Sequence, residues 1–250
     1  MHLVSIIMPT YNSSSTIHQS IESVISQTYT NWELLITDDC SSDDTYKIIC
    51  NYALKDHRIR VFQNNINSGA GLTRNNSIEH ARGRFIAFLD SDDMWTNDKL
   101  EKQIKFMLDN HFPLTYTYYK KTNASGEITG RLRPPLEVNY NELLKSNVIG
   151  CLTAIYDASS LGKVYMPTIR KRQDMGLWLN ILKIVPTAHC LAEELAIYRE
   201  GHESLSSNKL KILRTQWLFY REHVGLSFIK TLWYFSHYVI RALKKHKLPS

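Results

Sequence analysis

The stretch RFIAFLDSDD, residues 84–93, joins a short apolar run to a cluster of acids. Its apolar part is too short for a typical helix and contains no polar residue, so we expect a strand that is buried on both faces, as in parallel sheets. Asp90, Asp92 and Asp93 follow directly. Three carboxylates within four residues repel one another unless a cation neutralises them, and Mg²⁺ or Mn²⁺ prefers such oxygen ligands. A solvated loop that caps the next helix is the alternative.

The segments around this stretch alternate between strand and helix patterns. Strands are predicted at 4–8, 32–37, 58–63 and 84–89, and helices are predicted near 17–25 and at 42–55, 72–81 and 97–110. Strands that alternate with helices form βαβ units around a mostly parallel sheet. We therefore expect an α/β fold.

The pattern changes after residue 113. Strands are predicted at 114–121, 128–133, 152–156 and 195–199, a helix is predicted at 175–185, and the chain from residue 209 onward is helical in composition with a break at Gly225. We expect residues 1–110 to form the nucleotide-binding half of a domain and residues 111–207 to complete the same domain. Residues 208–250 are expected to form a basic helical tail.

The positive charge of the chain is concentrated in this tail. The formal net charge is +6, but residues 209–250 hold nine Lys and Arg and one acid, Glu222, which gives +8. The other 208 residues carry −2, so we expect no nucleic-acid partner. Eight aromatic residues are interleaved with the bases. This composition suits an anionic membrane surface, and the alternative is a helical pair that packs on the domain.

The chain has no clear targeting, membrane-spanning or disulfide pattern. Its apolar start lacks a basic segment and runs into Pro9, which is typical of a strand and not of a signal peptide. The longest apolar stretch, 224–243, is interrupted by charged residues. Without a C-x-x-C pair, the four cysteines are expected to be reduced and mostly buried; they are Cys40, Cys50, Cys151 and Cys190. We expect a cytoplasmic protein that is peripheral on the inner face of the cell membrane.

Polar residues follow three of the four predicted strands of the first half. Because ligands of open α/β sheets bind beyond the carboxyl ends of the strands, these residues predict a site there. Tyr11 could stack on a nucleobase and Asp39 could accept a hydrogen bond from it; otherwise Tyr11 caps the sheet and Asp39 caps a helix. Arg74 follows the glycines of GAGLTR at a predicted helix start, which suits a diphosphate. A surface arginine after turn glycines is the alternative.

Five motifs in a fixed order resemble the family 2 glycosyltransferases, which are inverting enzymes with the GT-A fold. They are VSIIMPTYN (4–12), SQTY with WEL (26–34), DDCSSD (38–43), NSG with TRN (67–75) and ARG with FIAFLDSDD (81–93). The match is dense over residues 3–100 and continues more thinly to about residue 207. The resemblance implies an α/β domain of GT-A type over residues 1–207, with its nucleotide side in residues 1–110 and its acceptor side in residues 111–207.

The resemblance also implies roles for individual residues. The nucleotide is expected at Pro9, Thr10, Tyr11, Asp39, Arg74 and Asp90. A Mn²⁺ or Mg²⁺ ion is expected at the DXD pair and its neighbours, Asp90, Asp92, Asp93 and His202. Asp174 matches the last acid of the family's acidic motif, which serves as catalytic base. Gln173 stands where many members have a glutamate, so Asp174 alone carries this role; a helix cap is the alternative role for Asp174.

The function implied by the resemblance is metal-dependent glycosyl transfer with inversion. A hexose or N-acetylhexosamine would move from a nucleotide sugar, expected to be UDP-linked, to a hydroxyl of a glycan or a lipid-diphosphate-linked sugar. The expected product is a β-linkage formed in surface polysaccharide assembly. Two rivals stay open: a sugar nucleotidyltransferase, and a catalytically silent module that binds nucleotide sugars on the same fold.

Overall fold

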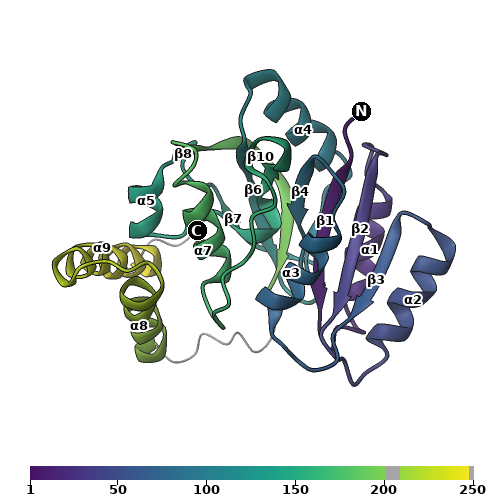
Figure 1. Ribbon diagram of the computed structural model, residues 1–250, viewed down its shortest axis with the longest axis horizontal. Helices are drawn as coiled ribbons and strands as arrows, with labels where there is room; N and C mark the ends of the chain where they lie inside the picture. The colour runs from purple at the N-terminus through teal and green to yellow at the C-terminus, as the bar shows by residue number, and fades with distance from the viewer. Residues whose placement is uncertain (201–208, 248–250) are drawn as a thin grey trace.

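One β-sheet runs through the molecule and carries helices on both faces (Figure 1). The computed structural model describes residues 1–200 and 209–247. The strands are β1 (Val4–Thr10), β2 (Trp32–Asp38), β3 (Ile59–Gln63), β4 (Phe85–Phe88), β5 (Met94–Trp95), β6 (Leu114–Thr122), β7 (Ile128–Leu132), β8 (Glu137–Val138), β9 (Ile155–Asp157) and β10 (Ala188–Arg199). The helices are α1 (Ile17–Ile25), α2 (Thr45–Lys55), α3 (Ala70–His80), α4 (Lys99–Asn110), α5 (Tyr140–Lys145), α6 (Ala158–Leu161), α7 (Gln173–Ile181), α8 (Lys209–Leu218) and α9 (Phe228–Lys247), with short turns η1 (Cys151–Thr153) and η2 (Phe219–His223).

The predicted α/β fold with a mostly parallel sheet is confirmed. Within the described residues the strand order is β3-β2-β1-β4-β9-β6-β10-β5, with β7 on β6 and β8 on β10. Strands β3, β2, β1 and β4 are parallel to one another. Strands β6 and β10 run in the same direction beyond the antiparallel strand β9. The carboxyl ends of these strands therefore meet at one edge of the sheet.

Strand β1 shows why the apolar runs lack polar alternation. All seven of its residues are buried. Ile7 belongs to the core beneath α3 and α7, whereas Ile6 and Met8 belong to the core beneath α1, α2 and α4. A strand that is covered on both faces needs apolar side chains at every position. The two cores thus cover both faces of the sheet beneath the edge where the polar residues gather.

Two predicted strands of the second half differ from the structure. In place of a strand at 152–156, η1 is followed by β9, because the Thr153 hydroxyl donates to the Gly150 carbonyl oxygen (2.7 Å) and closes a turn. The strand predicted at 195–199 is only the end of the 12-residue β10. The first part of β10 contains acids and register shifts around Glu194, which hide its strand period. The predicted helix at 175–185 spans Gln173–Ile181.

The prediction of mostly buried cysteines is wrong in part. All four are free thiols, but only Cys190 is buried. Cys50 and Cys151 are half-buried, and Cys40 is exposed. Cys40 lies in a left-handed turn (φ 64°) just after β2, where the chain leaves the sheet and the core no longer covers it.

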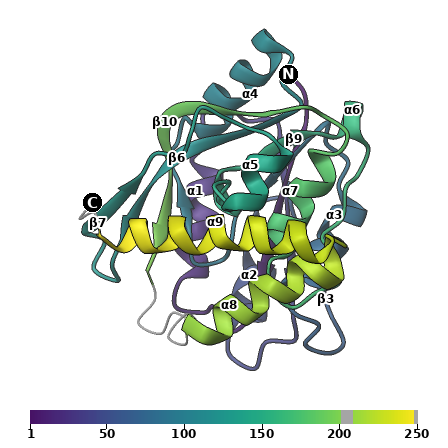
Figure 2. The ribbon, with the colours of Figure 1, turned by 90° about the vertical axis from the view of Figure 1, so that its left-hand side faces the viewer.

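The tail packs on the domain, which was one of the two predicted arrangements. Phe219 and Tyr220 join the core with α5 and α7, and the Tyr220 hydroxyl donates to the Leu144 carbonyl oxygen. The predicted break occurs at Gly225, which has φ 73°. Helix α9 then lies along the outer side of α5 and α8 (Figure 2). None of the helices within 1–200 and 209–247 combines the length and hydrophobicity of a bilayer span. The domain boundary predicted at residue 207 lies outside the described residues.

Candidate active site

The ends of β1, β2 and β4 come together as predicted. The backbone N–H of Asp39 donates to the Thr10 carbonyl oxygen (2.8 Å), which joins the ends of β1 and β2. The hydroxyls of Ser13 and Ser91 are 2.8 Å apart, which joins β1 to the acidic loop after β4. Pro9 and Thr10 are buried, and Tyr11 lies half-exposed above this edge. The Thr10 hydroxyl is buried and has no hydrogen-bond partner among residues 1–200 and 209–247.

Asp39 organises the loop that precedes α3. Its carboxylate accepts the backbone N–H groups of Ser68 and Gly69 (2.8 Å each) and the side-chain amide of Asn64 (2.8 Å). Gly69 has φ 84°, a conformation that favours glycine. A carboxylate offers about four acceptor positions, so Asp39 has capacity left for one more donor. Its neighbour Asp38 is fully buried and holds the turn at Ser41 instead.

Arg74 lies at the centre of the site. Its Nη2 donates to Asp90 Oδ1 at 2.5 Å, while its Nε has no partner within the described chain. Burial alone would lower the pKa of Arg74, but the carboxylates of Asp90 and Asp174 outweigh that effect and raise it. The guanidinium therefore stays charged. Because the side chain is buried, the alternative of a surface arginine is wrong.

The acidic loop carries more negative charge than its surroundings offset. Asp93 is buried and accepts the Arg199 backbone N–H (3.0 Å). Burial, followed by the charges of Asp90 and Asp92, raises the pKa of Asp93 well above its usual range. Loss of water and the charge of Asp90 also raise the pKa of Asp92. The negative charges of these carboxylates repel one another, and a bound cation would reduce this repulsion.

The loop offers only part of the ligand set that a divalent ion needs. Across residues 1–200 and 209–247, no three His, Cys, Asp or Glu side chains are grouped to hold a metal on their own. Asp90 and Asp92 keep contact with solvent, whereas Asp93 is turned toward the backbone of β10. His202 lies outside the described residues. Mg²⁺ and Mn²⁺ commonly fill their other positions with water and substrate phosphate.

Asp174 joins the same site from the other half of the domain. It lies in the first turn of α7, and its Oδ2 accepts the side-chain amide of Asn147 (2.8 Å). Its neighbour Gln173 lies against Gly71 in the first turn of α3, the helix that carries Arg74. The helix-cap alternative is wrong, because Arg172 occupies the N-cap position. No sequence pattern indicated Asn147, which lies between α5 and η1.

Two close contacts fix the segment that carries Asp174. A Cβ on Gly71 would lie 2.8 Å from the Gln173 side chain, so the first turns of α3 and α7 touch without spare room. Arg172 has a left-handed backbone (φ 65°), and its Nη2 donates to the hydroxyl of Tyr238 on α9 (2.7 Å). The tail therefore supports the residues just before the predicted base.

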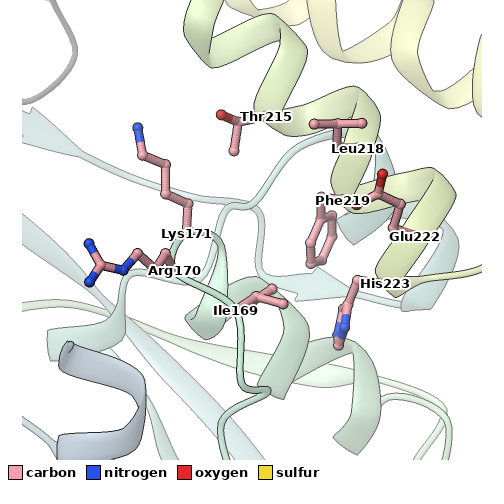
Figure 3. Close-up of a pocket in the computed structure, with 8 residues that line it drawn as sticks. All are labelled: Ile169, Arg170, Lys171, Thr215, Leu218, Phe219, Glu222 and His223. Atoms are coloured by element: carbon pink, nitrogen blue, oxygen red, sulfur yellow. The ribbon is translucent and has the colours of Figure 1, made fainter. Parts of the chain in front are cut away.

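A pocket that the sequence did not predict lies beside this segment. Its volume is about 370 Å³. Residues 169–171 form one side, and α8 with η2 forms the other (Figure 3). The side chains around it are Ile169, Arg170, Lys171, Thr215, Leu218, Phe219, Glu222 and His223.

Two curated bacterial proteins are similar to this chain over nearly its whole length. The chain is 42% identical over 244 residues to the teichuronic acid biosynthesis glycosyltransferase TuaG of Bacillus subtilis, covering 97% of each. It is 42% identical over 248 residues to WfgD of Escherichia coli, covering 98% of this chain and 95% of WfgD. WfgD is named a UDP-Glc:alpha-D-GlcNAc-diphosphoundecaprenol beta-1,3-glucosyltransferase.

Solved structures with the same fold include S. aureus TarS in complex with UDP-GlcNAc. The TM-score is 0.71 at 21% identity, over 96% of this chain and 72% of the TarS chain. The mannosyltransferase PcManGT of Pyrobaculum calidifontis, in complex with GDP-Man and Mn²⁺, gives a TM-score of 0.69 at 14% identity, over 99% of this chain and 76% of PcManGT. The predicted GT-A fold is confirmed by this likeness.

The sequence itself matches the family described as "Glycosyl transferase family 2" over residues 5–161. That match spans more than half of the chain and contains the edge built from Thr10, Asp39, Arg74 and Asp90. The chain therefore belongs to glycosyl transferase family 2.

Proposed function

We propose that this glycosyltransferase moves a hexose or N-acetylhexosamine from a UDP-linked sugar to a hydroxyl of a lipid-diphosphate-linked sugar, with inversion. One observation supports the proposal: the first turn of α7, which carries Asp174, lies against the first turn of α3, the helix that carries the buried Arg74 paired with Asp90. A carboxylate and a buried cation on two helices that touch suit the two ends of a displacement at the sugar carbon. Family membership makes the chain an enzyme of the hexosyltransferase class; the donor, the acceptor and the linkage are our inference.

The proposed mechanism divides the work between the two halves of the domain. Asp174, oriented by Asn147, takes the proton from the acceptor hydroxyl as that oxygen attacks. Arg74 meets the diphosphate as negative charge develops on it. Mn²⁺ or Mg²⁺, held by Asp90 and Asp92, would supply further positive charge at the leaving diphosphate. Attack from the side opposite the leaving group converts an α-linked donor into a β-linked product.

The nucleotide would lie over the ends of β1 and β2. Thr10 has a buried hydroxyl without a partner in the part of the chain that the structure describes, Tyr11 offers an exposed ring, and Asp39 has one acceptor position left. Pro9 fixes the backbone just before them. A uracil has an N–H that Asp39 could accept, and the name of WfgD includes UDP-Glc as donor. We therefore prefer UDP over other nucleotides.

A lipid-linked acceptor would require the protein to work at a membrane. WfgD is named for a diphosphoundecaprenol acceptor, which resides in a bilayer. In this chain, the outer face of α9 exposes Ile229, Trp233 and Leu243, and the α9 sequence contains no acid. Exposed apolar side chains flanked by bases suit the headgroup region of an anionic membrane. We propose that the protein binds the inner face of the cell membrane through residues 209–250.

The test is a donor screen with Mn²⁺ or Mg²⁺ and a GlcNAc-diphosphate-lipid acceptor. Release of UDP with a β-linked product supports the proposal. Consumption of pyrophosphate would instead indicate a sugar nucleotidyltransferase, and tight donor binding without any release would indicate a silent binding module. A sugar nucleotidyltransferase would carry its Gly-rich loop after the first strand. In this chain the GAGLTR loop follows β3, which argues against a nucleotidyltransferase.

Substitution of Asp174 by Asn tests the role of Asp174 as base without changing its contribution to the fold. The variant keeps its shape and its hydrogen bond to Asn147 but cannot accept a proton. We expect transfer to fall by about 10²-fold or more. The affinity for UDP, measured by calorimetry, should stay the same. A near-normal rate in Asp174→Asn would show that another group acts as base.

A further inference from the structure

We propose that the pocket between residues 169–171 and α8 with η2 binds the diphosphate and the first lipid segment of the acceptor. This inference rests on the proposed function and adds a location to it. The pocket of about 370 Å³ is lined by the segment that precedes Asp174 in the chain and by α8 and η2, and its lining includes neither Thr10 nor Asp39. Nothing in the motifs of the sequence pointed to it.

The lining has the two chemistries that a lipid diphosphate needs. Ile169, Leu218 and Phe219 supply apolar surface. Arg170 and Lys171 supply adjacent exposed cations, and neither makes an ion pair or a hydrogen bond with any residue that the structure describes. Arg74, the cation at the active site, is by contrast paired with Asp90. Two unpaired cations beside apolar surface favour a ligand that brings both negative charge and hydrocarbon.

The charges of the pocket are separated in space. Arg170 and Lys171 lie on one side, and Glu222 and His223 lie on the other, with Phe219 between them (Figure 3). Burial, followed by the charge of Lys183, lowers the pKa of His223 and so disfavours its charged form. The single carboxylate is thus set apart from the cationic side, where a diphosphate would bind.

The pocket is tied to the base by a short piece of chain. Lys171 precedes Asp174 by three residues, so their Cα atoms are at most about 11 Å apart. The side-chain amide of Gln173 donates to the Ile169 carbonyl oxygen (2.6 Å), which folds the segment back on itself. An acceptor could therefore present its sugar hydroxyl to Asp174 while its phosphates meet Arg170 and Lys171.

A kinetic comparison of two acceptors tests the assignment. One is GlcNAc-diphosphate-lipid and the other is an alkyl GlcNAc glycoside without phosphates, both with a fixed UDP-sugar. In the double variant Arg170→Gln, Lys171→Gln we expect KM for the diphosphate acceptor to rise at least tenfold, while KM for the glycoside and for the UDP-sugar stays unchanged. The matched control is Lys47→Gln, an exposed lysine on α2. Equal KM values in variant and wild type, or a rise for the UDP-sugar instead, would overturn the proposal.

A binding measurement keeps the inference testable even if no sugar transfer is found. Geranyl diphosphate, a short lipid diphosphate, should bind the wild-type protein and bind the double variant at least tenfold more weakly. Leu218→Asp should weaken it as well. Equal binding of geranyl diphosphate to wild type and double variant would contradict the pocket. Equal binding of inorganic diphosphate and geranyl diphosphate would contradict the proposal that the pocket binds the lipid segment.

Discussion

At the scale of the residue, the site depends on side chains that position a loop or another side chain through hydrogen bonds. Asp39 fixes the loop before α3, and Asn147 orients Asp174. Both act through hydrogen bonds to a carboxylate, which are stronger than those between neutral groups. The acids themselves could be predicted, because they follow apolar strands or match a motif. Asn147 could not, because a lone asparagine between two short elements carries no periodic signal.

Removal of the Asn147 side chain should slow the chemical step more than it weakens the fold. Without its hydrogen bond, Asp174 samples orientations that do not face the acceptor, so Asn147→Ala should lower kcat by about tenfold or more. Donor KM should hold, because Asn147 lies away from the nucleotide edge. Steady-state kinetics measure both, with the exposed Asn97→Ala as control. Equal losses in the two variants would contradict the positioning role.

Lys99 gives the molecule a specific dependence of stability on pH. Its ammonium is fully buried at the start of α4 and donates to Gln103 Oε1 (2.5 Å) and the Thr153 carbonyl oxygen (3.2 Å). Burial lowers the pKa of Lys99 to about 7. Since an unfolded lysine has a pKa near 10.4, the unfolded chain binds more protons between about pH 7 and 10, and folding becomes more favourable there as pH rises.

We therefore expect wild type to gain stability relative to Lys99→Met as the pH rises from about 7 to about 10. The slope should be at most about 1.4 kcal/mol per pH unit. Below pH 7 the difference should be constant, because both states carry the proton. Urea unfolding at a series of pH values measures it. A difference that does not change above pH 7 would show that Lys99 keeps its proton in the folded protein.

At the scale of the element, the N-terminal half was the easier part to predict. Its strands are apolar runs flanked by turn residues, and each predicted strand and helix is present. The two-residue strands β5 and β8 and the six-residue helix α5 were missed because each spans too few positions to show a period. The full length of β10 was missed because its register shifts around Glu194 break the alternation.

The contact between α9 and the segment before α7 should control catalysis. Tyr238→Phe removes the hydroxyl that accepts from Arg172, so the guanidinium of this residue loses its partner on α9. We expect kcat to fall several-fold while donor KM and the melting temperature stay close to wild type. Tyr234→Phe is the matched control, because it removes a similar bond from the same helix to Asn141 (2.8 Å). Identical effects of the two variants would mean that α9 acts only as a structural support.

At the scale of the whole molecule, charge is divided between an acidic edge and a basic tail. The edge offsets its charge with Arg74 and, in our proposal, a divalent ion. The tail uses one side of its last helix to contact the domain and leaves apolar side chains on the other side. The composition already showed this division of charge. Only the structure shows that one face of α9 packs on the domain while the other is exposed.

Binding to vesicles tests the outer face of α9. The protein should sediment with vesicles that contain anionic phosphatidylglycerol, more weakly with neutral phosphatidylcholine, and more weakly in high salt. Ile229→Ser with Trp233→Ser should reduce binding by about tenfold or more, since both side chains lose apolar area for insertion. Tyr46→Ser with Leu54→Ser, two exposed residues of α2, is the control. Undiminished binding of the first pair would contradict the assigned face.

The tight fit of Gly71 against Gln173 has a consequence for redesign. The helix that carries Arg74 and the helix that carries Asp174 meet there with no clearance for a methyl group. A larger residue at 71 would displace the end of the Gln173 side chain, which now donates to the Ile169 carbonyl oxygen, and would so disturb the segment just before the base. Variant libraries that aim at new donors should therefore treat positions 71 and 173 as one variable, and a gain in size at one should be matched by a reduction at the other.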